Sequence, residues 1–165
     1  MREALAWRVN SGGAMPTITF GTPTSEFHER TFRFAVDIVE FCRRLAREDD
    51  TSRTLGRQLL RAGTGVGSNM EEARAAYSRR DFAAKLSISL REARETVFWL
   101  RLIAATSPRH AEFTGNLGRE ANEFVAILTA SVKRTRATLL LNATLCIGAS
   151  VTLVAAYSTL LISYF

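Results

Sequence analysis

Proline is scarce in this chain of 165 residues, occurring only as Pro16, Pro23 and Pro108. Because proline ends or kinks helices, its rarity leaves long stretches free to be helical. The strict alternation of apolar and polar residues that marks a half-buried strand is also missing. These two absences argue against a β-sheet protein and favour an all-α fold.

Cysteine and histidine are equally rare. Cys42 and Cys146 form no CxxC pattern, and His28 and His110 are isolated from each other. A disulfide framework or a zinc site is therefore not expected, and the cysteine usage suits a reducing compartment. No nucleophile and base stand at a spacing typical of catalysis. We expect no enzymatic activity, no metal, no cofactor and no small-molecule substrate.

Acidic residues are the minority among the charged ones. The chain has 22 Lys and Arg against 16 Asp and Glu, which gives a formal net charge of +6. A basic balance favours polyanionic partners such as RNA, DNA or an anionic lipid surface. With 47% hydrophobic residues, the chain can also bury a sizeable core.

Charge is absent from residues 137–165, the last 29 residues of the chain. Such a run exceeds the roughly 20 residues needed to cross a bilayer, and it is a candidate transmembrane helix. Lys133, Arg134 and Arg136 stand just before it, so the remainder would stay cytoplasmic, tethered to the inner membrane. Two other interpretations stay open: an extra helix packed inside an oligomer, and translated sequence beyond an altered stop codon.

The sequence divides into a flexible leader over residues 1–26, a helical body over 27–136 and the uncharged tail. In the body, apolar residues recur at helical spacing in four segments. The first segment has two neighbouring apolar stripes, a face wider than one bundle interior needs. The first stripe consists of Phe34, Ile38, Phe41 and Leu45, and the second of Phe32, Ala35, Val36, Val39 and Cys42.

The other three segments complete an antiparallel up-and-down four-helix bundle with a hydrophobic C-terminal helix extension. The second helix is expected from about Ser52 to Tyr77, and a capping box at Ser78 and Asp81 begins the third. A connection from Ser107 through Gly115 precedes the fourth. Its inward residues are Leu117, Ala121, Phe124, Leu128 and Val132.

Three glycines in five residues, in LLRAGTGVGSNMEEA (59–73), raise the question of a phosphate-binding loop. No lysine follows Gly67 and no strand precedes it, so the Walker pattern fails. On a helix, Gly56, Gly63 and Gly67 fall within about 40° of one another. They predict a smooth strip where a neighbouring helix packs closely. Gly65 points elsewhere and has no packing role in this interpretation.

Arginines dominate the opposite side of the same helix. Arg53, Arg57 and Arg61 recur at i, i+4 and i+8 and form a basic ridge. Arginine forks suit phosphate groups, so the ridge is a candidate nucleic-acid surface, although a plain solvated face is the alternative. Further candidates from neighbouring basic clusters are Arg44, Arg79 and Arg80.

The third helix carries acidic and basic residues next to one another in sequence. Arg91 and Arg94 stand beside Glu92 and Glu95, and we expect these acids and arginines to pair along their own helix.

Three segments carry a family resemblance over about residues 27–136. They are RTFRFAVDIVEFCRRL, RQLLRAGTGVGSNMEEARAAYSRRDFAAKLSISLREARETVFWLRLI and EANEFVAILTASVKRTR. They resemble the four-helix bundle proteins encoded in 23S rRNA intervening sequences and, more distantly, the accessory variability determinant protein of diversity-generating retroelements. The resemblance implies a bundle that assembles into a homopentameric ring without catalytic activity. For the retroelement relative it also implies a basic surface that engages nucleic acid and a reverse transcriptase.

The matching positions fall in the glycine segment and the third helix. Among them, Asn69 and Glu72 are expected to satisfy helix neighbours or a subunit contact rather than to do chemistry. The sequence thus predicts a non-enzymatic oligomeric accessory protein that binds nucleic acid, with a membrane-tethered scaffold for anionic lipid or an acidic protein as the alternative. The matches are Gly63, Thr64, Val66, Gly67, Asn69, Glu72, Asp81, Phe82, Lys85, Glu92, Arg94, Glu95 and Trp99.

Overall fold

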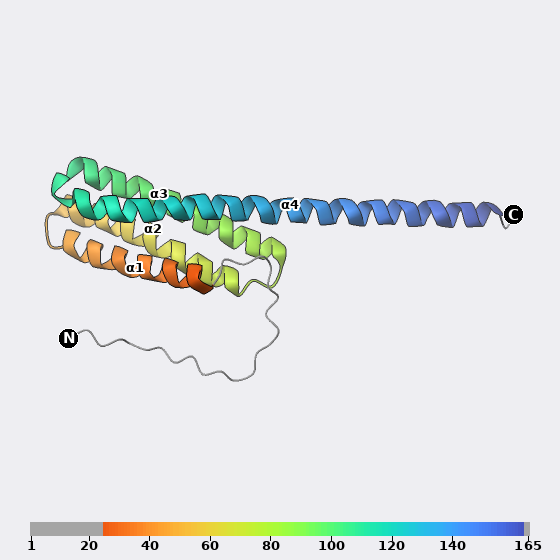
Figure 1. Ribbon diagram of the computed structural model, residues 1–165, viewed down its shortest axis with the longest axis horizontal. Helices are drawn as coiled ribbons and strands as arrows, with labels where there is room; N and C mark the ends of the chain where they lie inside the picture. The colour runs from red at the N-terminus through yellow and green to blue at the C-terminus, as the bar shows by residue number, and fades with distance from the viewer. Residues whose placement is uncertain (1–24, 164–165) are drawn as a thin grey trace, which may run out of the picture.

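The computed structural model describes residues 25–163, with side chains described as far as Leu141. This range holds four α-helices, one short 3-10 helix and no strand (Figure 1). The elements are α1 (Ser25–Leu45), α2 (Asp50–Arg74), α3 (Arg79–Thr106), η1 (Pro108–His110) and α4 (Ala111–Ser163). Most of the predicted leader falls outside the described residues, and α1 already begins at Ser25.

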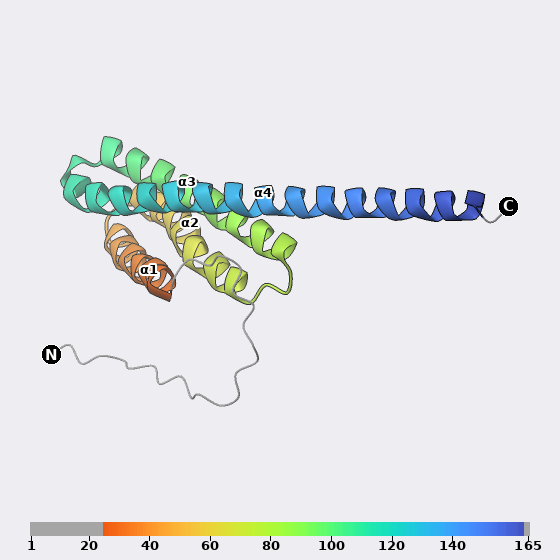
Figure 2. The same ribbon diagram turned by 45° about the vertical axis from the view of Figure 1, so that its right-hand side comes forward.

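The helices form an antiparallel bundle, which confirms the predicted all-α fold. Short turns join successive helices, and α2 packs between α1 and α3 while α3 also packs against α4. Figures 1 and 2 show α1 and α2 on one side of the bundle and α3 and α4 on the other. Arg30 of α1 links the first and last helices, because its guanidinium donates to both carboxylate oxygens of Glu120 at 2.6 and 2.8 Å.

The core is built from the predicted apolar stripes. In α1, the stripe from Phe34 to Leu45 is at most 2% exposed. The rings of Phe27 and Phe34 meet the ring of Phe124 edge-on, with centroids 5.5 and 5.1 Å apart. All five predicted inward residues of α4 are buried. The second stripe of α1 is different, because only its Cys42 is buried.

The helix ends differ slightly from the predicted ones. Asp49 is the N-cap of α2, its carboxylate accepting from the Ser52 amide at 2.9 Å, so α2 runs from Asp50 to Arg74 rather than from 52 to 77. The Ser78 hydroxyl accepts from the Asp81 amide at 3.1 Å, as the predicted cap of α3 requires. The expected connection as far as Gly115 is wrong, since α4 begins at Ala111.

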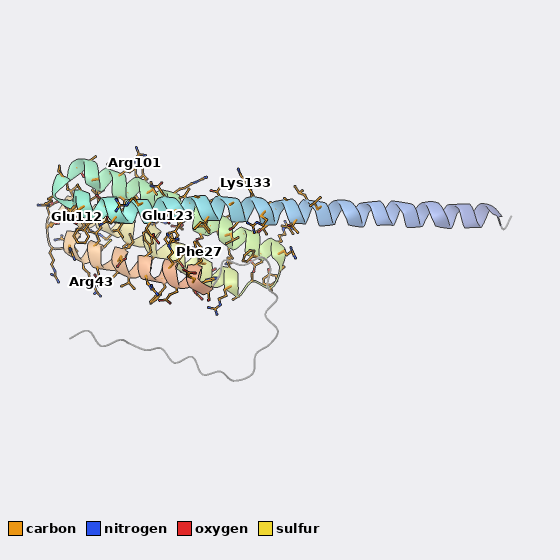
Figure 3. The ribbon with its side chains drawn as sticks, in the orientation of Figure 1. Phe27, Arg43, Arg101, Glu112, Glu123 and Lys133 are labelled. Atoms are coloured by element: carbon orange, nitrogen blue, oxygen red, sulfur yellow. The ribbon has the colours of Figure 1, made fainter. Side chains whose placement is uncertain are left out.

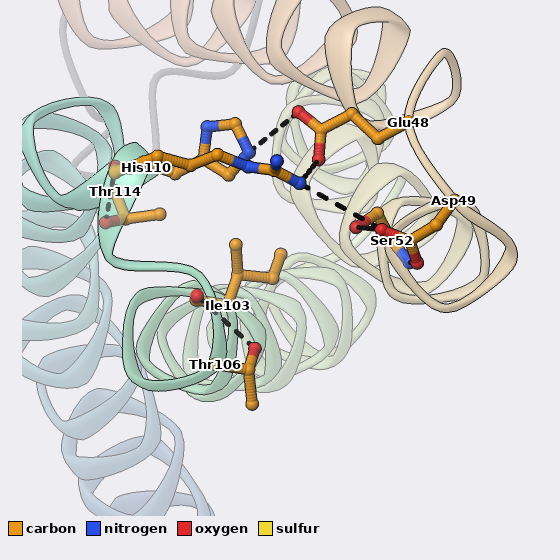
Figure 4. A network of polar contacts seen from close by, with 8 residues as sticks. Glu48, Asp49, Ser52, Ile103, Thr106, His110 and Thr114 are labelled. Carbon is orange, nitrogen blue, oxygen red and sulfur yellow. Dashed lines mark hydrogen bonds and ion pairs between the residues drawn. The ribbon is translucent and has the colours of Figure 1, made fainter.

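Polar contacts fix this tight connection against the turn between α1 and α2 (Figure 4). The Glu48 carboxylate lies 2.9 Å from Nε2 of His110 and 2.5 Å from Nη2 of Arg109. Pro108 stands in the first turn of η1, where its missing amide hydrogen costs nothing. The chain therefore turns within a few residues and α4 starts at once.

The glycine strip packs as predicted. A Cβ atom on Gly63 would lie 2.8 Å from two side-chain carbons of Ile38, and one on Gly67 would lie 3.3 Å from the carbonyl oxygen of Thr31. Gly56 faces Leu45 in the same way, so α1 lies directly on the strip. The segment is helical throughout, which rules out a phosphate loop there.

Gly65, which had no role in the sequence interpretation, receives α3. A Cβ atom on it would meet the Glu92 side chain at 3.0 Å. The glycines of α2 thus allow a neighbouring helix to pack closely on each side. Gly65 lies against α3, and the glycine strip lies against α1.

The structure describes the side chains of only the first residues of the uncharged tail. Within the described residues, no helical segment is both long and apolar enough to span a bilayer. The predicted transmembrane segment, 137–165, falls mostly beyond Leu141 and so lies outside the residues whose side chains are described. It stays a prediction.

Candidate nucleic-acid interface

The predicted ridge lies on the surface of α2. Arg53, Arg57 and Arg61 are all exposed. Arg53 pairs with Asp50 one turn earlier, and Nη2 of Arg61 reaches Oε1 of Glu95 on α3 at 2.5 Å. Arg57 makes no ion pair in the described part of the chain. The three arginines therefore differ in how freely they could meet a phosphate.

The position of the ridge needs one correction. It was expected on the side opposite the glycine strip, but Arg53 and Arg57 line the same groove between α1 and α2 as Gly56. This groove of about 220 Å³ has a largely apolar floor that includes Leu60, and Arg43 of α1 adds a third cation to its rim.

Cys42 also lines that groove, and its thiol is not part of a disulfide. Burial raises the pKa of its thiol to about 12. Since the thiolate is the reactive form, this thiol is inert near neutral pH. The groove offers an apolar floor and guanidinium groups rather than a nucleophile.

The other three predicted arginines lie elsewhere. The Arg44 guanidinium stacks over the Phe113 ring of α4, 4.2 Å from the ring centroid. Arg79 and Arg80 begin α3, at the opposite end of α2 from Arg53. At 1.5 Å per residue, α2 separates those ends by roughly 35 Å. The six predicted residues therefore do not share one surface.

Asn69 and Glu72 act within the bundle, as expected. The Asn69 amide donates to the carbonyl oxygen of Gly65 at 2.8 Å. The Glu72 carboxylate pairs with Lys85 and so ties α2 to α3. Both side chains thus have structural partners.

The expected pairing along α3 is wrong. Glu92 turns toward α2 and packs on Gly65. Glu95 accepts from Arg61 and, at 3.1 Å, from the indole nitrogen of Trp99. Across the described residues, Arg91 and Arg94 are left without an ion pair.

These unpaired arginines belong to a surface that the sequence analysis missed. Arg91, Arg94, Phe98 and Arg101 follow one another at i, i+3, i+7 and i+10, and all four are exposed. That spacing was visible in the sequence. Sequence reasoning missed it because Arg91 and Arg94 each have a glutamate next to them in sequence, whereas adjacent residues on a helix do not face each other.

The histidines do not form a metal site with their acidic neighbours. His28 is buried, with Nδ1 3.5 Å from an oxygen of Glu71. Burial lowers the pKa of His28, and the nearby carboxylate offsets only part of the effect. Among the described residues, no three His, Cys, Asp or Glu side chains gather in a way that could hold a metal ion.

Comparison with known proteins places this bundle in a family. Residues 24–130 match the family described as 23S rRNA-intervening sequence protein. No curated protein matches. A crystal structure from Bacteroides thetaiotaomicron, titled as a protein of unknown function from the S23 ribosomal protein family, shares 35% sequence identity with a TM-score of 0.60. The match covers 64% of this chain and 97% of that one. The chain therefore belongs to the 23S rRNA intervening sequence protein family.

Proposed function

We propose that this protein is a non-enzymatic, oligomeric accessory protein that binds nucleic acid through an arginine-rich surface. The observation that carries the proposal is the exposed ridge on α2, with Arg43, Arg53 and Arg57 around one groove. A formal net charge of +6 adds a general attraction for polyanions. RNA is favoured over DNA by the family's name only, and the ridge itself would accept either.

Binding through such a ridge depends on phosphate contacts and not on base sequence. Each phosphate that an arginine neutralises releases a counterion, which makes the affinity fall with rising salt. If several subunits assemble, each presents the same ridge, and contacts that are weak alone add up through effective concentration. We propose a pentamer, following the family resemblance, as the assembly that supplies this repetition.

Changing Arg53, Arg57 and Arg61 together to glutamine is therefore expected to weaken RNA binding and flatten its salt dependence. The slope of log affinity against log salt should fall by about one for each phosphate that an arginine no longer neutralises. A gel-shift titration at several salt concentrations measures both quantities. The fold should survive, because the three side chains are exposed.

A control variant with the same reduction in charge separates the ridge from net charge. Arg33, Arg74 and Arg119 are exposed arginines on α1, α2 and α4. Their triple change to glutamine should leave most of the affinity intact. Equal weakening in the two variants would mean that net charge alone attracts RNA, and no binding by the wild type at low salt would refute the proposal.

A membrane-tethered scaffold is the second candidate, favoured by the absence of charge after Arg136. In this arrangement the tail anchors the bundle to the cytoplasmic face of the inner membrane, where the basic surface meets anionic lipid or an acidic protein.

Carbonate extraction of expressing cells tests the tether. The full chain is expected in the membrane pellet, and the chain ended at Arg136 in the soluble fraction, since the uncharged run exceeds the length that a bilayer requires. If the full chain were extracted as completely as the shortened one, the tail would have another role.

A further inference from the structure

The outer face of α3 carries a cluster of arginines that make no ion pair within the described residues. Arg80, Arg91, Arg94 and Arg101 lie within about 80° of one another around the helix axis, together with Phe98. All are exposed. Figure 3 shows Arg101 and Lys133 on one side of the bundle and Arg43 on the other. This α3 face is therefore distinct from the groove between α1 and α2.

The acids of α3 do not neutralise this face. Glu92 is turned against Gly65 of α2, and Glu95 is held by Arg61 and by the Trp99 indole. None of the four arginines has an ion pair within the described residues. Four unpaired arginines on one helix face attract a polyanion.

The last helix extends the same basic surface. Nη2 of Arg136 on α4 donates to the hydroxyl of Ser87 at 3.3 Å. Ser87 lies on the same side of α3 as Arg91, one turn earlier. Arg136 thus reaches across from α4, and the exposed Lys133 stands one turn before it.

Phe98 stands in the middle of these cations with much of its ring uncovered. It is 54% exposed. The Trp99 ring meets it edge-on, at 74° and with centroids 4.9 Å apart. Trp99 is itself held by the 3.1 Å hydrogen bond to Glu95. The result is an aromatic ring held in place beside unpaired guanidinium groups.

We infer that the α3 face binds single-stranded nucleic acid, with an unpaired base stacked on Phe98 and the neighbouring phosphates held by Arg94 and Arg101. This inference rests on the proposed function and names the form of nucleic acid that the protein prefers. Stacking on an aromatic side chain requires an exposed base face, which a duplex does not offer along its length. From Arg91 to Arg101 the helix rises about 15 Å, enough for about four stacked nucleotides.

The test measures the affinity of the full chain for a labelled oligothymidylate of about 12 nucleotides, alone and annealed to its complement. Phe98→Leu keeps an apolar side chain but removes the ring, and should weaken single-strand binding on the order of fivefold while leaving duplex binding unchanged. Phe98→Tyr keeps the ring and should retain the affinity. Arg94→Gln with Arg101→Gln should weaken binding to both forms.

A spectroscopic readout reports on the ring directly. Trp7 and Trp99 are the two tryptophans of the chain, so Trp7→Phe leaves Trp99 as the single emitter. Because Trp99 touches Phe98, single-strand binding should change its emission, and Phe98→Leu should reduce that change.

Each contrary result is distinct. If Phe98→Leu binds the single strand as wild type does, the stacking contact is refuted while nucleic-acid binding stands. If the Arg94 and Arg101 variant is unaffected and the α2 ridge variant loses binding, the site lies on α2. Loss of assembly in Phe98→Leu, seen by light scattering, would make Phe98 a subunit contact. Binding to anionic vesicles without binding to either oligonucleotide would refute the inference together with the proposed function.

Discussion

Replacing Gly63 with leucine is expected to destabilise the bundle strongly. A Cβ atom alone would lie 2.8 Å from Cγ1 and Cγ2 of Ile38, and Ile38 is fully buried in the core. Neither side chain can move into solvent, so α1 must separate from α2 or the core must repack. Overpacking of this kind costs about 1–3 kcal/mol and sometimes more. Thermal unfolding followed by circular dichroism should show a clear drop in melting temperature.

Gly115 provides the matched control. It is an exposed glycine inside α4, and a Cβ atom there would meet nothing within 4 Å. Leucine at this position should stabilise the helix by up to about 1 kcal/mol, because leucine is the better helix former. The two substitutions are chemically identical and should have opposite signs. Equal melting temperatures for Gly63→Leu and wild type would mean that α1 does not lie on the glycine strip.

The fold was predictable because it depends on spacing along each helix. An apolar stripe such as the one from Phe34 to Leu45 marks the face of a helix that packs inward, whatever the order of the helices in the bundle. This stripe is buried as expected. The same arithmetic grouped Gly56, Gly63 and Gly67 into one strip. It could not say which neighbour covers which strip, since that depends on where α1 and α3 stand around α2. The sequence alone therefore assigned Gly65 no packing role, because the side chain that lies against it, Glu92, belongs to α3.

The candidate site was harder to predict for the same reason. Whether Arg91 and Arg94 are neutralised depends on the orientation of the adjacent Glu92 and Glu95 side chains. Both of these side chains contact α2 instead. Glu95 meets Arg61, which is 34 residues away in sequence. Likewise, Arg53 and Arg57 border the groove with α1 because that helix sits beside the ridge. Contacts between helices decide which arginines stay free of an ion pair. The spacing of residues along one helix gives no information about these contacts.

The exposed part of α1 gives the clearest argument for assembly. Phe32 is 63% exposed and Val36 is 42% exposed, one turn apart on the same helix. Beside them lies a groove of about 260 Å³ lined by Phe32, Ala35 and Gly67. Fully burying an exposed phenylalanine side chain gains about 1.5–3 kcal/mol, and covering the exposed 63% of Phe32 would gain the larger part of this. An apolar face next to a groove is the arrangement expected where another copy of the chain packs.

Phe32→Asp is therefore expected to dissociate the proposed oligomer into monomers, because each subunit contact would then bury a charge without a partner. Light scattering on the chain ended at Arg136 should show more than a dimer for the wild type and a monomer for the variant. Tyr77→Asp is the control, since Tyr77 is 88% exposed in the turn between α2 and α3 and should not affect assembly. Retained assembly in Phe32→Asp would place the subunit contact elsewhere, and a monomeric wild type at micromolar concentration would remove the proposed ring. The repeated ridge on α2 would then act singly, and its affinity for RNA should be correspondingly weak.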